Sequence, residues 1–392
     1  MNGTRPLAIK HHSLTGRISY ALMVEAFLAV KRNRGAAGVD RVSIGMFENN
    51  LEQNLVALMR QLKGRSFRPH PARRTYIDKE PGKKRPLGIP CVRDRVAQEV
   101  LRRLLTPLFE PLFHDQSYGF RPRRSCHDAL REVDRLHKAG YRFVLDADLK
   151  GFFDTIPHEV IMAGLRNVVA DGNILNLVEA FLKAGVMEDG VTHPTTVGTP
   201  QGGVLSPLLA NIALNFLDWQ LDEAGYRFVR YADDFVVLCR TKHRAEEARR
   251  FVETAASGLG LTLSSEKTVV ASFREGFAFL GFEITHRGRR MRAKSVEKYK
   301  ARIRELTIRC RNLDDRAVRR INAVIRGVAR YFATGFSTVT RQFRDLDCWT
   351  RLRLRSTKLK RIWKSDNFKL RNRHLRRMGL IALSDFLVSE PG

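Results

Sequence analysis

Three aspartates stand out because each lies at the end of an apolar run. Asp148 closes FVLDAD, and Asp233 and Asp234 lie between the runs FVRYA and FVVLC farther along the chain. Adjacent carboxylates at a tight turn repel each other unless a cation lies between them. Such acids could hold two Mg²⁺ ions about 4 Å apart. In nucleotidyl transfer, two ions of this kind activate the attacking 3′-oxygen and stabilise the leaving pyrophosphate. The competing interpretation is polar turn chemistry alone.

The elements that would position these acids are indicated by alternation and turn residues. Residues 143–149 predict a short strand, and residues 228–239 predict a β-hairpin with the two adjacent acids at its tip. The stretch from Arg68 to Pro90 is rich in Pro, Gly and cations, and it predicts a basic hairpin. Apolar residues at helical spacing predict helices over residues 18–31, 46–62 and 94–113.

Positive charge is distributed unevenly along the chain. Residues 287–377 hold 30 Lys/Arg and 7 Asp/Glu, a net charge of +23 out of +29 for the whole chain. From about Ser295 onward, the cations alternate with apolar residues at helical intervals, which predicts a separate helical domain. The loop SYGFRPRRS adds three arginines that suit phosphates. A polyanionic partner is the inference, because helices with one basic face could lie along a duplex.

The cysteines and the apolar runs exclude two classes of protein. No CxxC pair occurs, so neither a disulfide framework nor structural zinc is predicted, and a reducing cytosol fits. No run reaches the roughly 18 apolar residues of a membrane span, and the first residues lack an apolar core of signal-peptide length. We therefore expect a cytoplasmic protein without a membrane partner. The cysteines are Cys91, Cys126, Cys239, Cys310 and Cys348.

Eight blocks follow one another in an order that chance does not explain. They are AVKRNRGAAGVD, YIDKEPGKKRPLGIPCVRDRVAQE, SYGFRPRRSCHDAL, FVLDADLKGFFDTI, VGTPQGGVLSPLLANIALNFLD, RYADDFVVLC, LSSEKT and FLGFEI. With YADD as the palm signature, they resemble the group II intron-encoded reverse transcriptases over about residues 30–285. INAVIRGVARYF resembles the family's maturase segment more loosely. The resemblance implies an α+β right-hand polymerase fold, with an N-terminal extension, fingers and some palm in residues 1–140, the palm with part of the fingers in 141–294, and a helical thumb, or domain X, in 295–392.

Carried over residue by residue, the resemblance implies a metal site. Asp148, Asp233 and Asp234 become the catalytic ligands of two Mg²⁺ ions, with Mn²⁺ as a possible substitute. Asp146 lies two residues before Asp148 and points the same way along a strand. The family tolerates other residues at that position, so a structural role and a role in the site stay equally open for Asp146.

The resemblance also implies nucleotide contacts. Phe153 matches the steric gate that fills the space of a ribose 2′-hydroxyl, which implies deoxynucleotide substrates. An isolated Phe would otherwise be assigned to the core. Lys79 and Arg85 resemble fingers residues that grip the incoming triphosphate. Lys83 and Lys84 are close alternatives, and a solvated basic loop is the plain reading of all four.

Two further residues gain a role only from the resemblance. Gln201 in TPQGG matches a residue under the nucleotide sugar and template base, where Gly202 and Gly203 would let the backbone approach the substrate. Lys267 in SSEKT resembles a lysine proposed to protonate the leaving pyrophosphate. A surface lysine is the competing interpretation.

The function implied is an RNA-directed DNA polymerase that extends a DNA or RNA primer with dNTPs. Its template would be an intron or a structured non-coding RNA. One alternative is an RNA-binding maturase that assists intron splicing, and another is a domesticated reverse transcriptase in phage defence, DNA repair or a CRISPR system. The sequence reaches Gly392 without the paired cysteines and histidines of the endonuclease found in many such proteins, so the resemblance does not extend to cleavage of target DNA. The oligomeric state is open.

Overall fold

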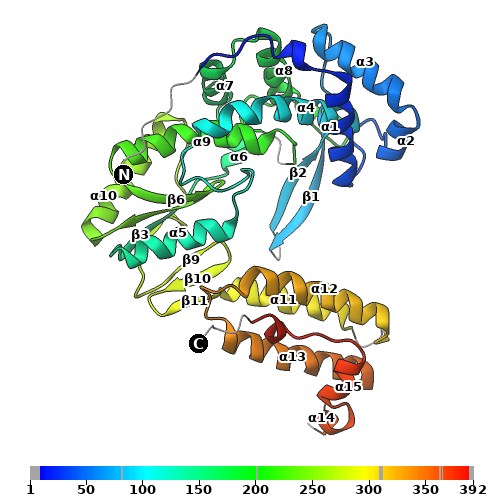
Figure 1. Ribbon diagram of the computed structural model, residues 1–392, viewed down its shortest axis with the longest axis vertical. Coiled ribbons are helices and arrows are strands. Elements are labelled where there is room, and N and C mark those ends of the chain that lie inside the picture. The colour runs from blue at the N-terminus through cyan, green and yellow to red at the C-terminus, as the bar shows by residue number, and fades with distance from the viewer. Residues whose placement is uncertain are drawn as a thin grey trace. The chain divides into compact units, whose positions relative to one another are not determined.

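The computed structural model describes residues 9–80, 83–199, 202–308, 312–361, 363 and 365–387. The chain divides into two compact units, of which the first ends at Val270 and the second begins at Ala271. Each unit combines helices with strands (Figure 1). The finer boundaries expected at residues 140/141 and 294/295 stay a prediction.

Several helices of the first unit begin at residues that cap free backbone amides. Ser19 accepts a hydrogen bond from the amide of Leu22. Ser125 and Asp128 form a capping box. Such caps replace hydrogen bonds that the first turn of a helix lacks. The helices are η1 (Thr15–Arg17), α1 (Tyr20–Arg32), α2 (Ile44–Asn49), α3 (Leu51–Lys63), α4 (Val92–Phe109), η2 (Glu110–Leu112), α5 (Cys126–Lys138), α6 (Phe152–Thr155), α7 (His158–Val168), α8 (Gly172–Lys183), α9 (Ser206–Glu223) and α10 (Lys242–Gly258).

The single helix expected over residues 46–62 is wrong. Two helices, α2 and α3, take its place and meet at Asn50, whose φ of −121° and ψ of 44° lie outside the helical region. Asparagine competes with a helix because its side chain bonds to nearby backbone groups in other conformations. The spacing of apolar residues continues across Asn50, so the sequence pattern does not show where α2 ends and α3 begins.

A four-stranded sheet carries the acidic hairpin. Strand β7 pairs antiparallel with β3 and with β6. Helix α10 packs on β3 and β7, while α5 packs on β6. Residues 235–239 of β7 are all buried, which explains why this strand has an unbroken apolar run instead of alternation. In the order β6-β7-β3-β8, the strands are β3 (Phe143–Asp148), β6 (Arg227–Tyr231), β7 (Asp234–Cys239) and β8 (Val269–Ser272).

The predicted basic hairpin is confirmed. Strand β1 (Ala72–Glu80) pairs antiparallel with β2 (Lys83–Ile89), and it also pairs parallel with β4 (Val186–Glu188). Strand β5 (Val191–His193) completes the sheet β2-β1-β4-β5. The β1–β2 hairpin extends beyond the helices that gather at its base (Figure 1).

The second unit joins a small antiparallel sheet to helices, and the helices occupy the cation-rich periodic part of the sequence. Helix α12 is amphipathic, with a buried apolar face and an exposed arginine face. The exposed arginines are Arg316, Arg319, Arg320, Arg326 and Arg330, and the buried residues include Val318, Ile321, Ile325 and Ala329. The elements are β9 (Phe277–Phe279), β10 (Phe282–Thr285), β11 (Gly288–Met291), α11 (Ala293–Leu306), α12 (Asp315–Phe332), α13 (Thr340–Leu359), α14 (Asp366–Lys369), α15 (Asn372–Arg377) and η3 (Leu383–Phe386).

Two properties concern the whole described chain. None of the helices within the described ranges combines the length and the apolarity that a membrane crossing requires. The thiols of Cys91, Cys126, Cys239 and Cys348 are free, and Cys310 lies outside the described residues.

Candidate active site

The register of the sheet brings the predicted catalytic acids together. Asp148, the last residue of β3, lies directly opposite Asp234, the first residue of β7. Residues opposed in this way have Cβ atoms about 4.5–5.5 Å apart, and like charges there are destabilising. Asp233 lies in the turn before Asp234, where Tyr231 and Asp234 close the hairpin. The three carboxylates therefore come from one end of the sheet.

Asp233 is half-buried, whereas Asp234 is exposed. Burial raises the pKa of Asp233, and the charge of Asp148 raises it further. A hydrogen bond from its own backbone amide, and the charges of Arg85 and Arg230, act in the opposite direction. A second ionised carboxylate is thus costly here unless more positive charge is supplied. Carboxylate oxygens are the ligands that Mg²⁺ prefers, so the donor set fits this ion.

Lys267 meets Asp148 although 119 positions separate them. Its Nζ donates to Oδ2 of Asp148 at 2.8 Å, and this hydrogen bond raises the pKa of Lys267. The amide of Ser264 donates to the backbone oxygen of Asp148 at 2.8 Å, which holds the segment of Lys267 beside β3. Because 61% of the lysine side chain is exposed, the ion pair contributes little to stability. The contact places Lys267 at the site, and its role in catalysis stays a prediction.

Arg85 lies on β2 and acts on the same site. Burial raises the pKa of Asp233 and that of Asp154, and the charge of Arg85 offsets part of the rise in both. The side chain of Lys79 lies outside the described residues, although its backbone belongs to β1. Lys84 is exposed. It lies on the opposite face of β2 from Arg85, since successive side chains of a strand point to opposite faces.

Phe153 is 9% exposed and lies in α6, just after the β3 strand of Asp148. Its ring meets that of Phe152 edge-on, with centroids 5.4 Å apart. Its backbone oxygen accepts the amide of Thr199 at 2.7 Å, which ties the predicted sugar gate to the loop before Gln201. Gln201 itself lies outside the described residues.

The glycine turn after Gln201 is held by protein contacts. A Cβ on Gly202, whose φ is +111°, would lie 2.6 Å from the backbone oxygen of Gly88 on β2. Oε1 of Gln98 accepts the amide of Val204 at 2.7 Å. Gly202 is therefore required where this turn passes β2.

The expectation that the arginines of SYGFRPRRS suit phosphates is wrong for Arg121. Arg121 is buried and donates to the backbone oxygens of His114 and Ser117, at 2.6 and 2.9 Å. Arg124 bonds to Asp115. Buried backbone carbonyls require donors, and Arg121 supplies them at the start of the loop and just before it. Its Nε also donates to Oε1 of Glu110 at 2.9 Å. Arg123 is exposed.

Apart from the acidic turn, a cluster of potential metal ligands lies at the start of α4. His70, Cys91 and Asp94 each bring one ligand atom to within 4.8 Å of the others. Asp94 already accepts the backbone amide of His70 at 2.9 Å and the guanidinium of Arg93 at 3.5 Å. These hydrogen bonds connect the start of α4 to the segment before β1. They give the cluster a structural role without a metal ion.

Sequence reasoning missed a buried group behind the acidic turn. Arg230, Asn211 and Asp218 are at most 1% exposed, and all three lie within or beside apolar runs. A charged residue lies inside each of the apolar runs FVRYA and LNFLDW. Because charged residues are almost never fully buried unless they are paired, these two residues could have been predicted to form a buried ion pair.

The comparison with protein families decides the class of this site. The family described as reverse transcriptase (RNA-dependent DNA polymerase) matches residues 77–284, more than half of the chain. The chain belongs to the reverse transcriptase family. Residues 296–379 of this reverse transcriptase match the group II intron, maturase-specific domain. The predicted enzyme class, right-hand fold and maturase-like C-terminal region are thereby confirmed.

Individual relatives agree with the family match. Protein YkfC of Escherichia coli (strain K12) is 35% identical over 303 residues, which cover 67% of this chain and 80% of YkfC. Group II intron-encoded protein LtrA of Lactococcus lactis subsp. cremoris is 47% identical over 169 residues, 43% of this chain but only 28% of LtrA. A structure of telomerase from Candida albicans with a fragment of telomeric RNA covers 86% of this chain and 66% of its own, at 15% identity and a TM-score of 0.46. A likeness at that level supports no inference.

Proposed function

We propose that this reverse transcriptase copies an RNA template into DNA by nucleotidyl transfer at Asp148, Asp233 and Asp234. The observation that carries the proposal is the register of β3 against β7, which sets Asp148 opposite Asp234 inside the matched region. Like charges on directly opposed residues destabilise a sheet, so the fold alone does not favour this pair. A metal-dependent reaction gives a reason for it.

Each residue has a task in this proposal. Two Mg²⁺ ions, or Mn²⁺ in their place, would be held by the three aspartates and would activate the primer 3′-oxygen and stabilise the leaving pyrophosphate. Arg85, with Lys79, neutralises charge on the triphosphate. Phe153 excludes the 2′-hydroxyl. Gln201 would lie under the sugar, and Lys267 would donate a proton to the departing pyrophosphate.

Primer extension tests the proposal. A DNA or RNA primer annealed to an RNA template should be extended with dNTPs and Mg²⁺, and EDTA should stop the reaction until Mg²⁺ is restored in excess. Product length on sequencing gels is the measurement. If no primed RNA yields DNA under these conditions, the proposed function is wrong.

Replacing Arg85 with alanine should raise the KM for dNTPs by about 10-fold or more, because a charge-assisted contact to the triphosphate is lost. Single-nucleotide incorporation measures this. Lys84→Ala is the matched control, since Lys84 is an exposed neighbour on the opposite face of β2. If Lys84→Ala raises the KM for dNTPs more than Arg85→Ala does, then Lys84 and not Arg85 contacts the triphosphate.

A maturase function is the second candidate, favoured by the match over residues 296–379 and by the arginine face of α12. Phosphate contacts from such a face would add salt-dependent affinity for RNA. Filter binding to a folded group II intron and to a scrambled RNA of equal length, at several salt concentrations, tests it. Equal affinities at every salt concentration would rule out specific intron binding.

The setting of the enzyme is a further part of the proposal. Four free thiols suit a reducing cytoplasm, where disulfides are rare. Sequencing the RNA that copurifies with the protein would identify the template. It would also separate an intron from the structured non-coding RNA expected for phage defence, DNA repair or a CRISPR system.

A further inference from the structure

Among the described residues of the first unit, Arg230 is the largest side chain that is fully buried. It lies in β6, three residues before Asp233, and is 0% exposed. A charged group that is removed from water must be compensated by hydrogen bonds and by opposite charge. Its partners therefore reveal what it holds in place.

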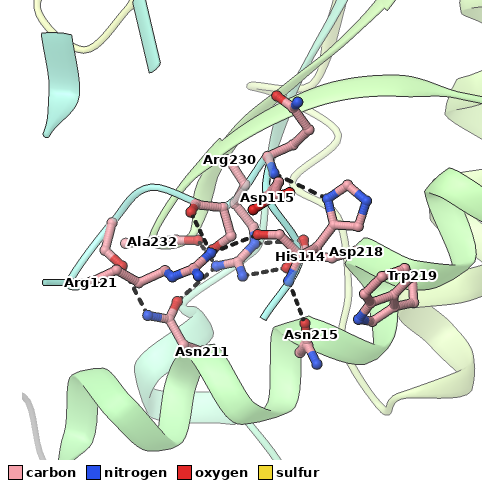
Figure 2. Close-up of polar contacts among 12 residues, drawn as sticks. His114, Asp115, Arg121, Asn211, Asn215, Asp218, Trp219, Arg230 and Ala232 are labelled. Carbon is pink, nitrogen blue, oxygen red and sulfur yellow. Dashed lines mark hydrogen bonds and ion pairs between the residues drawn. The ribbon is translucent and has the colours of Figure 1, made fainter. Parts of the chain in front are cut away.

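The guanidinium of Arg230 joins two elements. Nε and Nη2 donate to the two carboxylate oxygens of Asp218, at 2.7 and 2.5 Å, and Nη1 donates to Oδ1 of Asn211 at 3.0 Å. Both partners lie on α9 (Figure 2). Nη1 also donates to the backbone oxygen of Ala232 at 2.9 Å. The side chain thus connects α9 to the turn that carries Asp233.

That turn needs external support. Ala232 has a φ of +60°, a left-handed conformation that residues with a Cβ rarely adopt. The loop before α5 packs closely against this turn. A Cβ on Gly119 would lie 2.2 Å from the amide nitrogen of Ala232, so only glycine fits there. Nδ2 of Asn211 donates to the backbone oxygen of Gly119 at 2.9 Å. Asn211 therefore holds both the guanidinium and the loop against the turn.

Stability alone does not account for this arrangement. Burying an ion pair costs desolvation that its attraction barely offsets, and apolar residues of similar volume often serve a core equally well. Apolar residues cannot donate hydrogen bonds. The planar guanidinium donates at the same time to a carboxylate, an amide oxygen and a backbone carbonyl. Lysine, a point charge, does not reproduce these directions.

We propose that Arg230 is a positioning residue, which acts through the backbone oxygen of Ala232 to fix the direction of the Asp233 and Asp234 carboxylates. This inference rests on the proposed function of those acids. Arg230 itself is too deeply buried to touch a primer, a template or a nucleotide. The buried pair with Asp218 serves to anchor its fork to α9.

The test is Arg230→Lys, which keeps the charge beside Asp218 and loses the fork. Below the melting temperature of every variant, we expect kcat for dNTP incorporation to fall about 10- to 100-fold, as displaced catalytic groups do. KM for dNTPs and affinity for primer–template should change by less than about twofold, because neither contact is made by Arg230. Mn²⁺ binding to the protein, followed by electron paramagnetic resonance, should weaken.

Arg355→Lys is the matched control. Arg355 is 7% exposed, and it donates to the backbone oxygen of Leu370 and to Oδ1 of Asn372, at 2.9 and 2.6 Å. A backbone oxygen and an amide oxygen, two of the acceptor types around Arg230, thus recur around an arginine of the second unit. We expect this variant to lose stability while keeping kcat and Mn²⁺ binding.

The outcomes separate the inference from the function on which it rests. A wild-type kcat and Mn²⁺ affinity in Arg230→Lys, while Asp233→Asn is inactive, would overturn the positioning role alone. An inactive wild type would overturn the function. Should Arg230→Lys fail to fold, Asn211→Ala provides the second test, because it removes one acceptor of Nη1 and leaves the ion pair intact. A smaller fall in kcat with weaker Mn²⁺ binding is then expected, and unchanged values would count against the inference.

Discussion

Replacing Asp233 with asparagine is expected to reduce DNA synthesis by on the order of 10³-fold or more, as the loss of a central catalytic group does. Asn keeps the shape of the side chain and removes the charge that would hold a divalent cation beside Asp148. The same change relieves repulsion, because Asp233 is half-buried within the field of Asp148. In metal-free buffer, the melting temperature should therefore equal or exceed that of the wild type.

Primer extension and thermal unfolding, measured side by side, check both halves of this prediction. Asp189→Asn is the control, since Asp189 is an exposed acid of the same unit, at the turn between β4 and β5. It should change neither quantity. Synthesis at the wild-type rate by Asp233→Asn would remove this residue from the site, and loss of activity together with unfolding would show a structural role instead.

Replacing Phe153 with alanine should relax the choice of sugar. The ratio of kcat/KM for dNTPs to that for ribonucleotides is expected to fall about 10- to 100-fold, the range over which a pocket discriminates by size. The geometric reason is the position of Phe153, directly after the strand of Asp148 and bonded through its backbone to the loop of Thr199. Competing incorporation of labelled dNTP and NTP at one template position measures the ratio.

Phe152→Ala is the control for this prediction. Phe152 is its neighbour in α6 and is 2% exposed, so its truncation also leaves a cavity in the core, at a cost of about 3–5 kcal/mol. We expect Phe152→Ala to lose stability and keep its sugar selectivity. Equal relaxation in both variants would mean that loosening of α6 changes the selectivity, and unchanged selectivity in Phe153→Ala would refute a gate.

The local elements of the site were predictable because their patterns are local. Two apolar arms around Asp233 and Asp234 predict a hairpin, and the structure has one there. The cation-rich run between Arg68 and Pro90 predicts a second hairpin, which is also present. The break at Asn50 was hidden, because one residue leaves the helical conformation without disturbing the apolar spacing around it.

Roles for single residues came from the resemblance rather than from physical pattern. An isolated Phe153 reads as core, and the structure does bury it. Likewise, the arginines of SYGFRPRRS have the composition of a phosphate loop. Arg121 donates instead to the backbone oxygens of His114 and Ser117 and to the carboxylate of Glu110, and only the folded structure shows these contacts.

By itself, the sequence determined the class of the enzyme through the order of its motifs. It also determined the two hairpins and the basic, amphipathic character of the C-terminal part, since turn chemistry and helical periodicity are properties of neighbouring residues. The catalytic role of the three aspartates stays a prediction. The tertiary structure alone decided that Asp148 faces Asp234, that Lys267 reaches Asp148, and that Arg230 supports the turn from α9. Strand register and contacts between distant segments depend on how the whole chain packs, and local preferences do not encode them.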